Sequence, residues 1–219
     1  MEKILDLVMT PNGSGYVIEI NSQTYIATAY HVCFETDTPR PEIYIHFKGQ
    51  NQQLNIKEAT VIDGCKYHDI GLLKLKDPNI IFPWSHGKFS SSQNLEPGNT
   101  VFTMGSPRGS WFSISQGILM DTNVIQANIG LINCPQLLHH SAIVNPGNSG
   151  GPLLNDFGKI IGMNIGLLGG VNDAKTSLAV PSNCIIKDID SIANGRQINH
   201  ARTKATFCNS WELSKYNKT

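Results

Sequence analysis

One short segment carries residue types suited to nucleophilic chemistry, the run Asn145-Pro146-Gly147-Asn148-Ser149-Gly150-Gly151-Pro152-Leu153. Glycines on both sides of Ser149 predict a tight turn in which the backbone approaches a ligand closely and successive N–H groups point at one spot. Acyl transfer requires a hydroxyl that attacks a carbonyl and N–H donors about 3 Å from the oxyanion that forms. We expect Gly147, Asn148 and Ser149 to form that oxyanion hole, with the N–H groups of Gly147 and Ser149 as donors. A glycine-rich turn between two strands has the same composition, so this segment alone leaves a structural role open.

Two further segments supply the partners that a serine nucleophile needs. His31 follows an apolar run in Ala27-Thr28-Ala29-Tyr30-His31-Val32, and Asp69 precedes another in His68-Asp69-Ile70-Gly71-Leu72-Leu73. A serine hydroxyl is a poor nucleophile at neutral pH, so it needs a neutral imidazole as base and a buried carboxylate to fix the tautomer of that imidazole. The pattern indicates His31 as base, Asp69 as orienting acid and Ser149 as nucleophile, while His68 competes for the role of base.

Composition limits the class of protein. The chain has 219 residues, 17 basic and 17 acidic side chains, and 40% hydrophobic residues, which is typical of a globular protein. Balanced charge argues against nucleic acid or an anionic membrane as a partner. No apolar run reaches the roughly 20 residues of a membrane span, and the N-terminus lacks the apolar core of a secretory signal. We therefore expect a cytoplasmic protein, with export by a signal-independent route or action in a host cell left open.

The five cysteines are odd in number, scattered and without a C-x-x-C pair. This pattern favours neither a zinc site nor a disulfide framework, and it fits a reducing compartment. We expect no metal and no cofactor.

The elements that must position these residues read mostly as short strands. Residues 16–20 and 24–28 form an expected hairpin around Asn21-Ser22, because β-branched and aromatic residues flank a turn. Further strands are expected at 43–48, 70–75, 100–104, 111–120, 124–132, 137–144 and 159–168. One helix is expected from a cap at Ser182 to Gly195, and the polar stretch 84–99 is expected to connect two halves. Short strands with one terminal helix predict an all-β sandwich or barrel.

Taken together, these segments resemble chymotrypsin-fold serine proteases of the HtrA/DegP-like branch. The resemblance rests on TAYHV around His31, HDIGLLKL around Asp69 and NPGNSGGPL around Ser149, whose order His, Asp, Ser is the chymotrypsin order. Four further segments match in the order of the family: Gly13 to Ile18, Gly105 to Gly109, Gly158 to Asn164 and Ala179 to Asn183.

The resemblance implies two six-stranded antiparallel β-barrels with the active site between them and a C-terminal helix. Residues 1–90 would form the first barrel with His31 and Asp69, and residues 91–195 the second barrel with Ser149 and the helix. Residues 196–219 would form a basic and aromatic tail. The tail is too short for the PDZ domain that usually follows the protease in this branch, so regulation is expected from the barrels, the tail or another chain.

One departure concerns activation. Asn148 replaces the aspartate that binds a freshly cut N-terminal ammonium in trypsin-like zymogens, so activation by clipping is not expected.

The resemblance also places the specificity pocket at Ile143, Val144 and Asn164-Ile165-Gly166-Leu167. The absence of a carboxylate there disfavours cleavage after Arg or Lys and favours a small or medium aliphatic side chain before the scissile bond. His139 and His140 precede the nucleophile loop, and either recognition of an acidic side chain or a packing role is open to them.

The sequence therefore predicts a serine endopeptidase that binds a protein or peptide as an extended strand. Two alternatives remain at this point: a processing protease for one specific protein, and an inactive protease-like binding module. A homo-oligomer is also possible, because proteins of this branch are commonly trimers.

Overall fold

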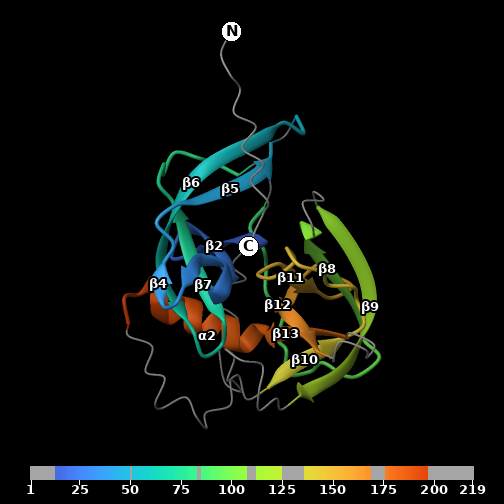
Figure 1. Ribbon diagram of the computed structural model, residues 1–219. Helices are drawn as coiled ribbons and strands as arrows, with labels where there is room; N and C mark the ends of the chain where they lie inside the picture. The colour runs from blue at the N-terminus through green and yellow to red at the C-terminus, as the bar shows by residue number, and fades with distance from the viewer. Residues whose placement is uncertain are drawn as a thin grey trace.

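The structure, a computed structural model, describes residues 13–49, 51–82, 85–107, 112–124, 136–168 and 176–196. Two β-rich halves lie side by side, blue to teal and green to orange, and helix α2 (Ser182–Ala193) lies under the first half (Figure 1). Within these residues, no helix combines the length and the hydropathy of a membrane span.

The first half is an antiparallel sheet of five strands in the order β1-β2-β7-β6-β5. Its strands are β1 (Gly15–Ile20), β2 (Gln23–Ala29), β5 (Ile43–Lys48), β6 (Leu54–Cys65) and β7 (Ile70–Leu75). Between β2 and β5 the chain forms a one-turn helix and a small hairpin, α1 (Tyr30–Cys33), β3 (Phe34–Glu35) and β4 (Thr38–Pro39).

The second half is a closed six-stranded barrel in the order β10-β13-β12-β11-β8-β9. Its strands are β8 (Thr100–Gly105), β9 (Ser113–Val124), β10 (Leu137–His140), β11 (Pro152–Leu154), β12 (Ile160–Leu168) and β13 (Thr176–Pro181). The predicted all-β, chymotrypsin-like fold with a six-stranded barrel and a C-terminal helix is confirmed. The first half differs in strand number from the expected six, because no strand among the described residues pairs with the outer edges of β1 and β5.

The expected hairpin at the start of the chain forms as predicted. Ile20 pairs with Gln23, which leaves Asn21 and Ser22 as a two-residue turn with φ of 50° and 60°. Positive φ at both positions is the requirement of a type I′ turn, whose twist matches that of the flanking strands. This turn sets the register that carries β2 toward His31.

A single hydrophobic cluster joins the two halves. Ile18 and Leu72 of the first half and Met163 and Val180 of the second are each 1% exposed or less and belong to it, together with Ile189 of α2. The shared cluster fixes the two halves against each other, and residues at their junction are held by both.

The predicted boundary between the two domains at residue 90 stays a prediction.

Helix α2 forms at the predicted place with one detail corrected. Its isoleucines at 185, 186, 189 and 192 are buried, and the helix packs against β6, β7, β12 and β13. Gly195 follows with φ of 66°, as expected of a residue that ends a helix. Ser182 is the first helical residue and not the cap, because its hydroxyl donates to the Ser90 carbonyl at 2.7 Å.

The cysteines depart from expectation at one position. Cys33 and Cys65 are buried thiols that form no disulfide, in keeping with a role as small core residues. Cys184 is disulfide-bonded, which the cysteine pattern, favouring no disulfide framework, did not predict. The predicted strand at 124–132 lies, beyond Val124, outside the described residues, as do residues 197–219 of the predicted tail.

Candidate active site

The register of the first sheet brings His31 and Asp69 together. Ala29, at the end of β2, pairs with Ile70, at the start of β7. His31 follows Ala29 by two residues on α1, and Asp69 directly precedes Ile70, so both lie at the same end of the strand pair. The Tyr30 N–H donates to the Asp69 carbonyl at 3.0 Å and ties the two segments to each other.

Asp69 holds His31 through two hydrogen bonds. The His31 backbone N–H donates to Asp69 Oδ1 at 2.9 Å, and His31 Nδ1 lies 2.7 Å from Asp69 Oδ2. An ionised carboxylate only accepts, so Nδ1 carries the proton in this pair, and Nε2 keeps a free lone pair. The arrangement leaves His31 able to accept a proton on its far side.

The two side chains differ in exposure, as their predicted roles require. Asp69 is buried, and the His31 side chain is 36% exposed. Burial lowers the pKa of His31, but the hydrogen bond and the charge of Asp69 outweigh it, so the pKa of His31 is raised from its ordinary value of 6.5. The carboxylate therefore stabilises the protonated form of the His31 ring.

Ser149 lies in a tight loop built on two glycines. The Asn148 N–H donates to the Asn145 carbonyl at 2.9 Å, and the Gly151 N–H donates to the Asn148 carbonyl at 2.9 Å. Gly147 and Gly150 have φ of 102° and 84°, a backbone conformation that favours glycine. These successive turns are the local reason for the glycines that flank Ser149.

The loop packs directly on the end of β2. A Cβ atom at Gly150 would lie 2.3 Å from the Ser14 carbonyl oxygen, 2.4 Å from Thr28 Oγ1 and 2.7 Å from the Ala29 nitrogen. Only a residue without a side chain permits this approach. Because Ala29 precedes His31 by two residues, the contact brings the Ser149 loop to the same strand end as His31 and Asp69.

Ser14 supports the Ser149 loop, a role that the sequence analysis did not assign to it. Its hydroxyl donates to the Gly147 carbonyl at 2.6 Å and accepts from the Ser106 N–H at 2.9 Å, and its backbone N–H donates to the Ser149 carbonyl at 2.8 Å. These bonds direct two loop carbonyls toward Ser14. The Gly-Ser-Gly sequence at the start of a strand was the available signal.

The predicted oxyanion residues fall into two groups. Asn148 uses its N–H inside the turn, so it is not a free donor. The N–H groups of Gly147 and Ser149 have no hydrogen-bond acceptor among the described residues. Of the three predicted residues, these two present N–H groups that can bind a developing oxyanion.

The predicted specificity residues are also divided by the structure. Ile143 is 66% exposed, and Gly166 and Leu167 are partly exposed. The side chains of Val144, Asn164 and Ile165 are at most 5% exposed. Asn164 has an internal role, because its amide donates to the Gly151 and Pro152 carbonyls at 3.1 Å each.

His140 belongs to the same internal network, which favours packing over recognition of substrate. It is fully buried, and its Nε2 lies 3.1 Å from Asn164 Oδ1. Burial lowers the pKa of His140 to about 4, so the ring is neutral at physiological pH. Its neighbour His139 is hydrogen-bonded to Thr176.

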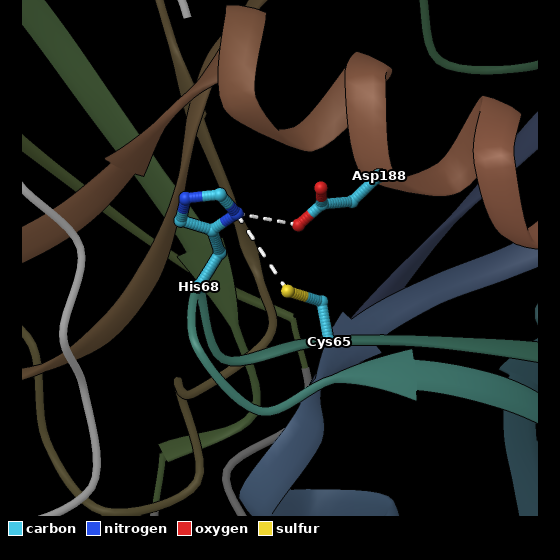
Figure 2. Close-up of side chains that lie close together, drawn as sticks. All are labelled: Cys65, His68 and Asp188. Carbon is cyan, nitrogen blue, oxygen red and sulfur yellow. Dashed lines mark hydrogen bonds and ion pairs between the residues drawn. The ribbon is translucent and has the colours of Figure 1, made fainter. Parts of the chain in front are cut away.

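A second group of chemically active side chains lies on the other side of the Asp69 loop. Cys65, His68 and Asp188 are buried, and their donor atoms all lie within 4.8 Å of one another (Figure 2). These are zinc-ligand types, but His68 Nδ1 and Asp188 Oδ2 are 2.6 Å apart, whereas two ligands of a tetrahedral zinc lie about 3.3 Å apart. Burial raises the pKa of the Cys65 thiol. The geometry is that of a hydrogen-bonded pair beside a thiol.

Comparisons with known proteins agree with this geometry. The family described as a trypsin-like peptidase domain matches residues 13–163. A serine protease Do-like HtrA of Lactobacillus helveticus is 29% identical over 194 residues, 85% of this chain and 44% of that relative. A probable periplasmic serine endoprotease DegP-like of Chlamydia pneumoniae is 28% identical over 187 residues, 85% of this chain and 35% of that relative. The chain spans less than half the length of either.

The solved structures give the same result for the fold. The HtrA-type protease AlgW with a decapeptide superposes with a TM-score of 0.68 at 22% identity, over 84% of this chain and 52% of AlgW. The chain belongs to the trypsin-like peptidase domain family. Within that family it is similar to the HtrA and DegP-like serine proteases named above.

Proposed function

We propose that this protein is a serine endopeptidase that cleaves peptide bonds through an acyl-enzyme on Ser149. The observation that carries the proposal is the His31–Asp69 contact at 2.7 Å, at the strand end against which the Ser149 loop packs. Membership of a peptidase family supports the same reaction.

The first half of the reaction forms the acyl-enzyme. Ser149 Oγ attacks the carbonyl carbon of the scissile bond while its proton passes to His31 Nε2. The negative charge that develops on the carbonyl oxygen is stabilised by the N–H groups of Gly147 and Ser149. The C–N bond then breaks, and His31 gives its proton to the leaving amine.

The second half repeats these steps with water as the nucleophile. His31 takes a proton from the water, the hydroxide attacks the acyl carbon, and the C–O bond to Ser149 breaks as the proton returns to Ser149. Throughout, Asp69 keeps Nδ1 protonated and the ring in one orientation. Asp69 stabilises the positive charge on the His31 ring and keeps that ring oriented, and it does not take the proton itself.

An unpaired strand edge supports binding of an extended substrate. β11 pairs with β12 only as far as Met163, opposite Pro152, whereas β12 continues to Leu168 with β13 as its partner on the other side. Among the described residues, positions 165–168 therefore have one edge without a strand partner. A peptide that adds to this edge would run past the Ser149 loop.

The side chain before the scissile bond is proposed to be small or medium and aliphatic. Ile143, Gly166 and Leu167 are the predicted pocket residues that reach the surface, and none carries a charge. A basic or acidic side chain would find no partner among them, so desolvation would oppose its binding.

A peptide library tests this proposal. We expect purified protein to cut internal bonds after Val, Ile, Leu or Ala, with sites read by mass spectrometry, and Ser149→Ala protein to cut none. Cleavage in a single sequence context would identify a processing protease. Folded protein that binds peptides without cutting any would identify a binding module and overturn the proposal.

A further inference from the structure

The loop between β6 and β7 presents two consecutive side chains in different directions. Cys65 and Ile70 are the last strand pair of this hairpin, so residues 66–69 form the loop. Asp69 contacts His31, and His68, one residue earlier, contacts Asp188 on α2. One short loop thus carries one member of each of two carboxylate–imidazole pairs.

The second pair is fully enclosed. His68 and Asp188 are each 2% exposed, and His68 Nδ1 lies 2.6 Å from Asp188 Oδ2 (Figure 2). A buried carboxylate or imidazole is strongly destabilising unless it has a hydrogen-bonded partner, so separating the two is unfavourable. The pair therefore fastens the loop to α2, an element of the second half of the chain.

The backbone of the loop gains from such external support. Asp69 has φ of 56°, in the left-handed region that aspartate enters more often than most residues but less readily than glycine. The hydrogen bond within the loop, from the Asp69 N–H to the Lys66 carbonyl, is long at 3.4 Å. Two contacts from outside the loop support Asp69. The Asp69 carbonyl accepts from the Tyr30 N–H, and the neighbouring His68 contacts Asp188.

We propose that His68 and Asp188 are positioning residues that set the orientation of the Asp69 carboxylate toward His31. The inference rests on the proposed endopeptidase function and extends it, because it makes the seating of α2 a condition for efficient catalysis. Neither residue touches the reacting atoms. Their loss lets Asp69 turn away from His31, which slows acylation and lowers the pKa of His31, and leaves peptide binding unaffected.

The pair offers variants that separate positioning from folding. His68→Asn keeps an N–H donor near the place of Nδ1. His68→Leu leaves Asp188 buried without a partner, and that variant can unfold. The double variant His68→Leu/Asp188→Leu replaces both polar groups by apolar ones, an exchange that buried ion pairs often tolerate. Ile189→Val, at a fully buried position next to Asp188 on α2, is the matched control for loss of helix packing.

Two readouts test the proposal, and one is independent of activity. In the double variant we expect kcat for a peptide substrate to fall about 10- to 100-fold with KM unchanged, as for a small displacement of a catalytic group. We also expect the pKa of His31, followed by NMR of ring-labelled histidine, to fall relative to wild type. His68→Asn and Ile189→Val should keep both values near those of wild type.

Two results would overturn the inference: a folded double variant with wild-type kcat, or one with an unchanged pKa of His31. If wild type itself shows no turnover, the proposed function fails, and the NMR titration still decides whether the pair positions Asp69.

Discussion

Asp69 contacts His31 at two atoms, accepting the backbone N–H at 2.9 Å on Oδ1 and lying 2.7 Å from the ring Nδ1 through Oδ2. The first bond fixes the main chain of α1, and the second fixes the ring. A carboxylate that binds both the backbone N–H and the ring of a histidine favours one tautomer and one orientation of that ring. The predictions below follow from this contact and from the packing that maintains it.

Replacing Asp69 by Asn should nearly abolish turnover while the protein stays folded. An amide can donate to Nδ1 and so favours the tautomer whose Nε2 is already protonated, which cannot act as a base. We expect kcat to fall on the order of 10³- to 10⁴-fold in a peptide cleavage assay. Asp156→Asn, on an exposed turn, is the control and should be neutral. A loss below tenfold in Asp69→Asn would argue against an orienting role.

Acylation should rise with pH through a midpoint above 6.5. The proposed base is neutral His31, and its pKa is raised because the hydrogen bond and charge of Asp69 outweigh the effect of burial. Below the pKa the imidazole is protonated and inactive, and above it the imidazole can take the Ser149 proton. The rate of fluorophosphonate labelling as a function of pH gives the midpoint. A midpoint below 6.5 would contradict the proposed electrostatic role of Asp69.

A methyl group at Gly150 should displace the nucleophile loop. In Gly150→Ala the new Cβ meets Ser14, Thr28 and Ala29 at 2.3 to 2.7 Å, and the residue also keeps φ of 84°. We expect a loss of about 2–4 kcal/mol in the free energy of unfolding and labelling slowed more than 100-fold.

Gly158→Ala provides a matched comparison for Gly150→Ala. Gly158 has φ of 68° and nothing within 4 Å of an added Cβ, so only the backbone strain remains, about 1 kcal/mol. Its labelling rate should equal that of wild type. Equal effects of the two substitutions, measured by denaturant unfolding and labelling, would show that the approach of Gly150 to β2 is unimportant.

Stability should fall as the pH drops from about 6.5 to about 4. Burial lowers the pKa of His140 from 6.5 to about 4, so between these values the unfolded chain binds a proton that the folded chain does not. The free energy of unfolding therefore rises with pH across this window, by about 3 kcal/mol at most, and levels off above it. Denaturant midpoints at several pH values measure the slope.

His140→Gln should reduce that slope, because the titrating ring is gone and an amide group remains near Asn164. An unchanged slope in His140→Gln would mean that another group dominates the acid response.

Residues with local signals were predictable from sequence, and residues defined by distant partners were not. Strands 43–48 and 70–75 were predicted with the observed bounds, because their apolar patterns are regular. β6 was missed, because polar residues and a register shift between Val61 and Asp63 interrupt its alternation. The expected strand at 137–144 ends at His140, where the chain turns toward the nucleophile loop.

The same distinction holds for the site. His31, Asp69 and Ser149 stand in short motifs whose chemistry is recognisable, and the structure tests the contact of the first two directly. His140 and Asn164 lie inside the second barrel because their side chains point inward from β10 and β12. When both faces of a strand are apolar, the alternation of residues in the sequence does not show which face points inward. The His68–Asp188 contact joins residues that are 120 positions apart in the sequence, and no motif around either residue indicates the other as its partner.

The most direct test of an activated Ser149 is the intact mass of the protein after treatment with a fluorophosphonate. We predict a single adduct on wild type, none on Ser149→Ala and a strongly reduced rate on Asp69→Asn. A wild-type protein that is folded by circular dichroism and gains no adduct would contradict the assignment of Ser149 as a nucleophile activated by His31.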